Sequence, residues 1–251
     1  MPEIPTMLEM LQAGVHFGHK ASKWHPKMKP YIFGERSDVH IINLEETAKK
    51  LKEALDFIKK TTAAGGVVIF VGSKEQAKEI VKRHAADAGA PYVVTRWLGG
   101  TFTNFKTIRS VVDRFTDLKN KTATGGLAKY TKKEQLNFQK EIVKLEELVG
   151  GIETLKKLPE AIFVIDVRAE NTTVAEARKK KVPVVALCDT NINPDDVDYP
   201  IPSNDDAVKT IEMMVGLAAA AVKEGKQDYD AKKGAEKQAV AEVKAVENPK
   251  A

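Results

Sequence analysis

Apolar residues along the chain follow two alternating patterns. Apolar runs at residues 67–71, 161–166 (which ends in Asp166) and 183–188 are typical of strands buried on both faces, as in a parallel sheet. Between them, apolar residues recur at the three- and four-residue spacing of one helix face. Further strands are expected at residues 38–44 and 91–95, and helices at residues 45–61, 74–88, 173–181 and 206–223. Alternating strands and helices predict a doubly wound α/β fold on a parallel sheet.

The alternation stops at residues 103–149, where two helical patterns follow one another without a strand. Thr131 and Glu134 form a capping-box sequence that marks the start of the second helix. The apolar stripes of the two helices consist of Phe105, Ile108, Val112, Phe115, Leu118, Phe138, Ile142, Leu145 and Val149. Narrow stripes on otherwise charged helices favour an inserted antiparallel coiled-coil hairpin. The alternative is an ordinary pair of core-packed helices.

The two ends of the chain differ in character. Thr6 and Glu9 form another capping box and predict a short helix that ends at Gly14. Residues 224–251 mix Lys, Glu, Ala and Gln with few large apolar side chains, so burial cannot offset the entropy of ordering them. We therefore expect an α/β domain from residues 1–102 and 150–223, a hairpin at residues 103–149, and a flexible charged tail at residues 224–251.

Composition narrows the class of protein only a little. The chain is 43% hydrophobic and 30% charged, as in ordinary globular proteins, and its net charge of +5 favours a polyanionic partner weakly. The single cysteine, Cys188, lies in an apolar run and indicates a buried residue in a cytosolic protein. Apolar runs are too short to span a bilayer, and no secretory signal is visible. These features predict a cytoplasmic protein without membrane contact.

Ligands of open α/β sheets bind at the carboxyl ends of the strands, so those ends are the places to look for chemistry. The turn at residues 72–74 offers a phosphate site at a helix start, but it lacks the rest of a Walker loop. Asp166 and Asp189 follow adjacent strands and are candidate magnesium ligands; alternatively, each caps its own loop through backbone N–H groups. An enzyme acting on a phosphate ligand or through a metal is therefore the alternative hypothesis, because no nucleophile with a partner base accompanies the two aspartates.

Two histidines near the N-terminus have a spacing that suits metal ligands on a helix. His16 and His19 lie three residues apart, but glycines flank them and no cysteine is near. Packing, hydrogen bonding or RNA stacking is favoured for both. We therefore expect neither a metal nor a cofactor.

Residues 16–36 form a polar, aromatic and basic segment that is predicted as a loop. Its cations can neutralise phosphates, its rings can stack on exposed bases, and its prolines lower the entropy lost on docking. The alternative is a surface loop whose rings fold back on the core. The RNA-binding candidates here are Lys20, Lys23, Trp24, His25, Lys27, Lys29, Tyr31 and Arg36.

A second RNA-binding region is predicted where the hairpin begins. Gly99 and Gly100 allow a close approach of the backbone to a partner, and the outer faces of the hairpin are rich in basic residues. Its candidates are Arg96, Asn104, Lys106 and Arg109. Trp97 is expected to seal the base of the hairpin.

Residues 189–206 form an acidic loop with six aspartates and no Lys or Arg. Such a loop repels phosphate, so the RNA face is expected elsewhere. The proline-rich stretch at residues 199–202 suggests a rigid surface that another protein contacts through Asp195, Asp196 and Asp198. A solvated acidic loop without a partner is the alternative.

Several long segments of the chain resemble the bacterial ribosomal protein S2 family. AGVHFGH at residues 13–19 and WHPKMKPYIFGER at residues 24–36 are similar to the family's opening. RWLGGTFTNFKTI, PEAIFVID, EAR and a stretch containing DTN and DYPIPSNDD follow in the same order, at residues 96–108, 159–166, 176–178 and 184–206. The resemblance extends from about Met7 to Val222.

This resemblance implies a flavodoxin-like (Rossmann-like) α/β domain with an inserted coiled-coil hairpin. It also implies a structural place between the head and body of the small ribosomal subunit, bound to 16S-type ribosomal RNA and to neighbouring ribosomal proteins. A role in recruiting the first, messenger-binding protein of the subunit is implied as well. No catalysis is implied.

Overall fold

A five-stranded parallel sheet forms the centre of the molecule in a computed structural model, which describes residues 3–127 and 129–247 and side chains as far as Gly234. All neighbouring strands are parallel. Their order across the sheet is β5 (Tyr92–Val93), β4 (Val68–Val71), β6 (Ala161–Val164), β7 (Val184–Cys188) and β8 (Tyr199–Pro202). The three predicted apolar runs are the central strands β4, β6 and β7, and every residue of these strands is buried.

Helices cover both faces of this sheet, because successive side chains of each strand point to opposite sides. Phe70 of β4 enters the core on one face, whereas Ile69 and Val71 enter the core on the other. The first face is covered by α1 (Met7–Ala13), α2 (Leu44–Ala63), α3 (Glu75–Asp87) and α7 (Val208–Glu247). The second is covered by α6 (Asn171–Lys180) and the base of α4 (Phe105–Ala123) and α5 (Lys132–Val149). The arrangement is compatible with the predicted Rossmann-like fold.

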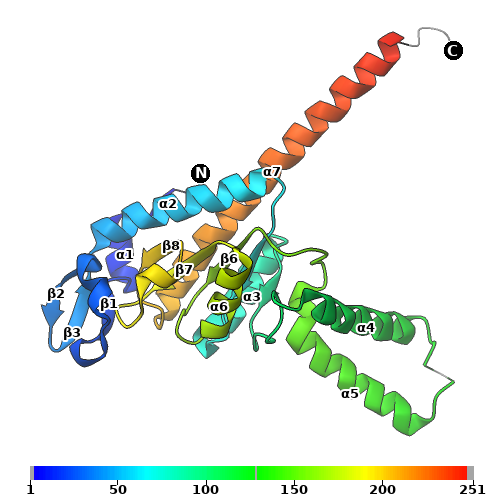
Figure 1. The fold of residues 1–251 in the computed structure, drawn as a ribbon, viewed down its shortest axis with the longest axis horizontal. Helices are drawn as coiled ribbons and strands as arrows, with labels where there is room; N and C mark the ends of the chain where they lie inside the picture. Colours follow the sequence, from blue (N-terminus) through cyan, green and yellow to red (C-terminus); the bar gives the residue numbers. More distant parts are fainter. Residues whose placement is uncertain (1–2, 128, 248–251) are drawn as a thin grey trace.

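Helices α4 and α5 lie side by side and project from one end of the sheet (Figure 1). The predicted capping box at Thr131 and Glu134 is formed. Val112, Phe115 and Val149 of the predicted apolar stripes are buried in the same core as Ile162 of the central sheet. The base of the helix pair therefore shares the core of the α/β domain, while the distal turns extend away from it.

A separate three-stranded antiparallel sheet contains the strand predicted at residues 38–44, and its other two strands lie where a loop was predicted at residues 16–36. It contains β1 (Phe17–Lys20), β2 (Ile32–Arg36) and β3 (Val39–Ile42) in the order β1-β3-β2, with the short 3-10 helices η1 (Ala21–Lys23) and η2 (Pro26–Tyr31) between β1 and β2. A two-residue turn joins β2 to β3, and its residues Ser37 and Asp38 have φ angles of 52° and 61°. Positive φ at both positions is the geometry of a tight hairpin turn, usually marked by Asn-Gly. The residues Ser37 and Asp38 do not carry this sequence signal, so the turn was not predicted.

The sequence pattern also missed the edge strand β8, which lies within the predicted acidic loop. Its prolines, Pro200 and Pro202, have no N–H to donate and are tolerated because β8 has a neighbour on one side only. Asp198 fixes the start of this strand: its carboxylate accepts from the N–H of Val184 at 2.8 Å.

The expectation of a last helix ending near residue 223 was wrong, because α7 continues to Glu247 and extends beyond the body of the protein (Figure 1). Ala, Lys, Glu and Gln are strong helix formers even without a buried face. The first part of the extension also contacts the domain: Lys226 Nζ donates to the carbonyls of Ala88 and Gly89 at 2.9 and 2.7 Å. Residues 248–251 of the predicted tail lie outside the described residues.

A buried carboxylate on α6 holds the turn from which the helix pair begins. Glu176 accepts hydrogen bonds from the backbone N–H groups of Gly100, Phe102 and Thr103 at 2.6, 2.9 and 3.0 Å. Burial opposes its charge, but these donors outweigh burial and hold the pKa of Glu176 below its ordinary value. Trp97 is buried beside it, as predicted, with its ring edge-on to Phe102.

Replacing Glu176 by Ala should lower the free energy of unfolding by about 3 kcal/mol, because several backbone donors lose their acceptor in a buried place. Chemical denaturation measures this loss. Glu79→Ala is the matched control: Glu79 is exposed on α3, and its loss should change stability by less than about 0.5 kcal/mol. Equal effects of the two changes would contradict the role assigned to Glu176.

Candidate functional site

The carboxyl ends of the central strands meet around the ammonium group of Lys74, which follows β4. Its Nζ lies 3.0 Å from Asp166, 2.8 Å from Asp205 and 2.7 Å from Asp206. Burial opposes the positive charge, but the three carboxylates outweigh it and raise the pKa of Lys74. In many α/β proteins this place is a ligand-binding crevice. Here a cation from the chain itself occupies it.

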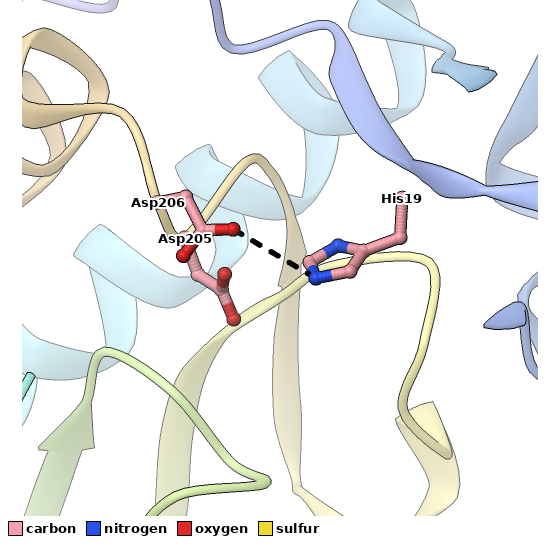
Figure 2. Close-up of side chains that lie close together, drawn as sticks. All are labelled: His19, Asp205 and Asp206. Carbon is pink, nitrogen blue, oxygen red and sulfur yellow. Dashed lines mark ion pairs between the residues drawn. The ribbon is translucent and has the colours of Figure 1, made fainter.

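His19 of β1 reaches the same cluster from the antiparallel sheet. Its Nδ1 lies 3.0 Å from Asp189, and its Nε2 lies 3.7 Å from Asp206. Figure 2 shows the imidazole directed toward Asp205 and Asp206. One imidazole nitrogen and two carboxylate oxygens here lie within 4.8 Å of one another, a donor set that a divalent cation such as Zn²⁺ accepts.

The residues brought together here differ from the two pairs, His16 with His19 and Asp166 with Asp189, that were weighed from the sequence as candidate metal ligands. His16 faces a different surface, so the structure does not bring it together with His19. Asp166 accepts from the N–H groups of Arg168 and Ala169, and Asp189 accepts from the N–H of its neighbour Thr190. Both aspartates thus cap their own loops, as the alternative interpretation stated.

The cluster carries more negative than positive charge, and Asp205 shows the consequence. Its side chain is almost fully buried. Burial and the nearby carboxylates of Asp166 and Asp189 raise the pKa of Asp205 to about 7. The hydrogen bond to Asp189 raises the pKa of His19, although burial opposes it.

The basic segment at residues 16–36 presents its cations to solvent and keeps most of its rings against the protein. Trp24 and His25 are half-buried, and Trp24 lies tilted over His40 with 5.2 Å between ring centroids. Tyr31 packs against the second core. The cations Lys20, Lys23, Lys27, Lys29 and Arg36 are all exposed. Trp24, His25 and Tyr31 thus follow the alternative interpretation, whereas Phe33 is exposed.

The RNA-binding candidates at the base of the helix pair differ in whether their side chains are free to bind a partner. Arg96, Asn104 and Lys106 are exposed. Arg109 instead donates to the carbonyls of Glu153 and Leu155 and pairs with Asp113 at 2.9 Å. The Arg109 guanidinium is therefore already bonded within the protein and is less available to an RNA phosphate.

The aspartates of the predicted protein-facing loop all have partners within the chain. Asp195 pairs with Lys27 at 2.5 Å, and Asp196 pairs with Arg178 at 2.7 Å. Asp198 holds the start of β8, as described above. The loop therefore offers a partner less free negative charge than its composition indicates.

Sequence reasoning missed Lys74, Asp205 and Asp206 as members of one cluster. Lys74 was weighed only as part of a phosphate turn, and the two aspartates only as part of an acidic loop. Their positions in the sequence could have indicated the cluster, because all three residues follow a strand or precede a helix at the same edge of the sheet.

Together these features describe a Rossmann-like α/β protein that fills its own crevice with an ion-pair cluster and presents a basic accessory sheet beside it. The family described as ribosomal protein S2 matches residues 10–225. The chain therefore belongs to the ribosomal protein S2 family, a family of structural ribosomal proteins and not of enzymes. Within the part of the chain that the structure describes, no helix is long and apolar enough to cross a membrane.

Asp205 predicts a pH dependence of stability. Its pKa is about 7 in the folded chain against an ordinary value of 3.8, so its stabilising contribution is complete below pH 3.8 and is lost as pH rises through 7. Between about pH 4 and pH 8, the wild-type free energy of unfolding should fall relative to that of Asp205→Asn. Urea denaturation across this range measures the difference, and Asp38→Asn, in an exposed turn, is the control. A constant difference between wild type and Asp205→Asn would contradict the prediction.

Proposed function

We propose that this chain is a structural constituent of the small ribosomal subunit in the cytoplasm, where it binds 16S-type ribosomal RNA and helps to recruit the first, messenger-binding protein. The observation that carries the RNA-binding proposal is the solvent-facing basic segment. RNA is bound largely through its phosphates, which require cations that are not already neutralised.

Four cations of this segment meet that requirement. Lys20, Lys23, Lys29 and Arg36 are exposed, and none of them forms an ion pair within residues 3–127 and 129–234. Lys27 is paired with Asp195, so a phosphate must compete with that carboxylate. Arg96, Asn104 and Lys106 extend the proposed RNA surface toward the helix pair.

A different surface suits a protein partner. Met7, Leu11 and Phe33 line an apolar hollow of about 310 Å³ between α1 and the antiparallel sheet, and the side chain of Phe33 is 78% exposed. His16 also lines it and has a buried Nδ1 without a partner among the described residues. Exposed apolar patches of this kind mark protein contacts. We assign the principal contact with the first small-subunit protein to this hollow, with the acidic loop around Asp195, Asp196 and Asp198 as a secondary contact.

The helix pair α4–α5 is proposed to act as a coiled-coil arm that adds contact area within the subunit. Arg114 of α4 pairs with Glu141 of α5 through a bond of 2.6 Å, which joins the helices beyond the shared core. Leu136 and Val143 lie one heptad apart on α5, and both are exposed. The outer face of the arm is therefore open to neighbours.

The RNA-binding proposal predicts a change in salt dependence. Replacing Lys20, Lys23 and Lys29 by Gln should reduce the magnitude of the negative slope of log affinity against log salt by about two to three. Each phosphate contact that is lost means that fewer counterions are released when the RNA binds. Binding to small subunits depleted of this protein, titrated with salt, measures the slope. The control replaces Lys49, Lys52 and Lys60, which are exposed on α2, by Gln. An unchanged slope in the first variant would show that the RNA surface lies elsewhere.

The protein-facing hollow predicts a separate loss. Leu11→Ser with Phe33→Ser should reduce retention of the first small-subunit protein on subunits by about tenfold or more, because the apolar contact area is removed. Quantitative sedimentation of reconstituted subunits measures retention. Val208→Ser, which changes an exposed apolar residue of α7 outside the hollow, is the control. Equal retention by the two variants would count against the hollow, whereas loss of RNA binding in the first would indicate a folding defect.

A further inference from the structure

The C-terminal end of α6 carries four consecutive cations that the RNA candidates do not include. Arg178, Lys179 and Lys180 form the last turn, and Lys181 is the left-handed C-cap with φ 57°. All four are exposed. Of these, only Arg178 is held in an ion pair within the described side chains. Lys179, Lys180 and Lys181 thus repel one another, and none of the described carboxylates forms an ion pair with them.

An ion-pair bridge places this run beside the basic segment. Asp196 pairs with Arg178 of α6, while its neighbour Asp195 pairs with Lys27 of η2. Two adjacent residues of η4 (Pro194–Asp196) therefore connect cations that are 151 positions apart in the sequence. Helix η2 also packs against η4, which keeps Lys27 and the basic segment close to the loop that pairs with Arg178.

Stabilisation of the helix end accounts for only part of the run. Cations in the last turn interact favourably with the helix dipole, typically by about 0.3–1 kcal/mol. This effect fades beyond the last turn, and Lys181 has already left the helical conformation. The helix dipole therefore does not explain why Lys181, a third unpaired lysine, lies here beside the basic segment.

We propose that Lys179, Lys180 and Lys181 form a second phosphate-binding patch, which contacts the same ribosomal RNA as the basic segment. The inference rests on the proposed RNA-binding function. Between the two basic surfaces lie Asp195 and Asp196, whose carboxylates already pair with Lys27 and Arg178, so this stretch offers no free cation to a phosphate. The RNA therefore contacts the protein on either side of η4, through two separate stretches of backbone. Such an arrangement selects the spacing of two RNA strands rather than a base sequence.

The test compares three variants of the full chain in binding to small subunits depleted of this protein. The first replaces Lys179, Lys180 and Lys181 by Gln. The second is the basic-segment variant with Lys20, Lys23 and Lys29 replaced, and the third is the control with Lys49, Lys52 and Lys60 replaced. Each removes three exposed positive charges, so any effect of net charge alone is the same in all three. Thermal unfolding of each variant confirms that it is folded.

Relative to the α2 control, the α6 variant should reduce the magnitude of the salt slope by about two to three. Combining it with the basic-segment variant should reduce the magnitude by about four to six. If the basic-segment variant lowers the slope and the α6 variant behaves as the control, the second patch is refuted while the proposed function stands. If neither differs from the control, the proposed RNA surface itself is refuted. An α6 variant that weakens binding equally at all salt concentrations would also overturn the patch, because phosphate contacts are salt-dependent.

Discussion

The ammonium group of Lys74 is the charge on which the arrangement of this protein depends. It brings together the loops that follow β6 and β8 by pairing with Asp166, Asp205 and Asp206. Loss of this cation would leave three neighbouring carboxylates without their counter-charge in a poorly solvated place, so the cluster depends on Lys74. The crevice that other Rossmann-like folds use for a ligand is thereby turned into a structural joint.

This joint also positions the accessory sheet that we propose to bind RNA. His19 of β1 reaches Asp189 at the strand ends, and the backbone N–H of His19 donates to the Thr190 hydroxyl at 2.9 Å. The N–H of His25 donates to the Thr190 carbonyl at 2.8 Å. A Cβ on Gly18 would lie 2.6 Å from the side chain of Thr190, so only glycine permits this approach. The basic segment is therefore attached to the central sheet through a few defined contacts.

The sequence predicted those elements whose signals are local. Apolar runs identified β4, β6 and β7, and capping boxes identified the starts of α1 and α5. Elements that depend on tertiary pairing were missed. Strand β8 contains two prolines and forms only because β7 offers it an edge. The hairpin turn at Ser37 and Asp38 has a positive-φ geometry that its residue types seldom indicate.

The candidate site was predicted less well than the fold, for the same physical reason. Exposed cations can be recognised from composition, and those of the basic segment are indeed exposed. Whether a charge is free, however, depends on partners far away in the sequence. Lys27 and Asp195 are 168 positions apart, yet each neutralises the other. Arg109 looked available on a helix surface but binds carbonyls of a later turn.

The formal net charge of +5 therefore understates the field that an RNA would meet. Asp166, Asp189 and Asp205 are buried, and internal donors hold each of them. Their charge is directed inward, toward Lys74 and His19, while the lysines of the basic segment and of the α6 end face solvent. Carboxylates and ammonium groups count equally in a sequence, but a phosphate outside the protein interacts most strongly with the charges that remain exposed and unpaired. Separation of charge by burial, rather than total charge, is what makes a weakly basic chain suited to a polyanionic partner.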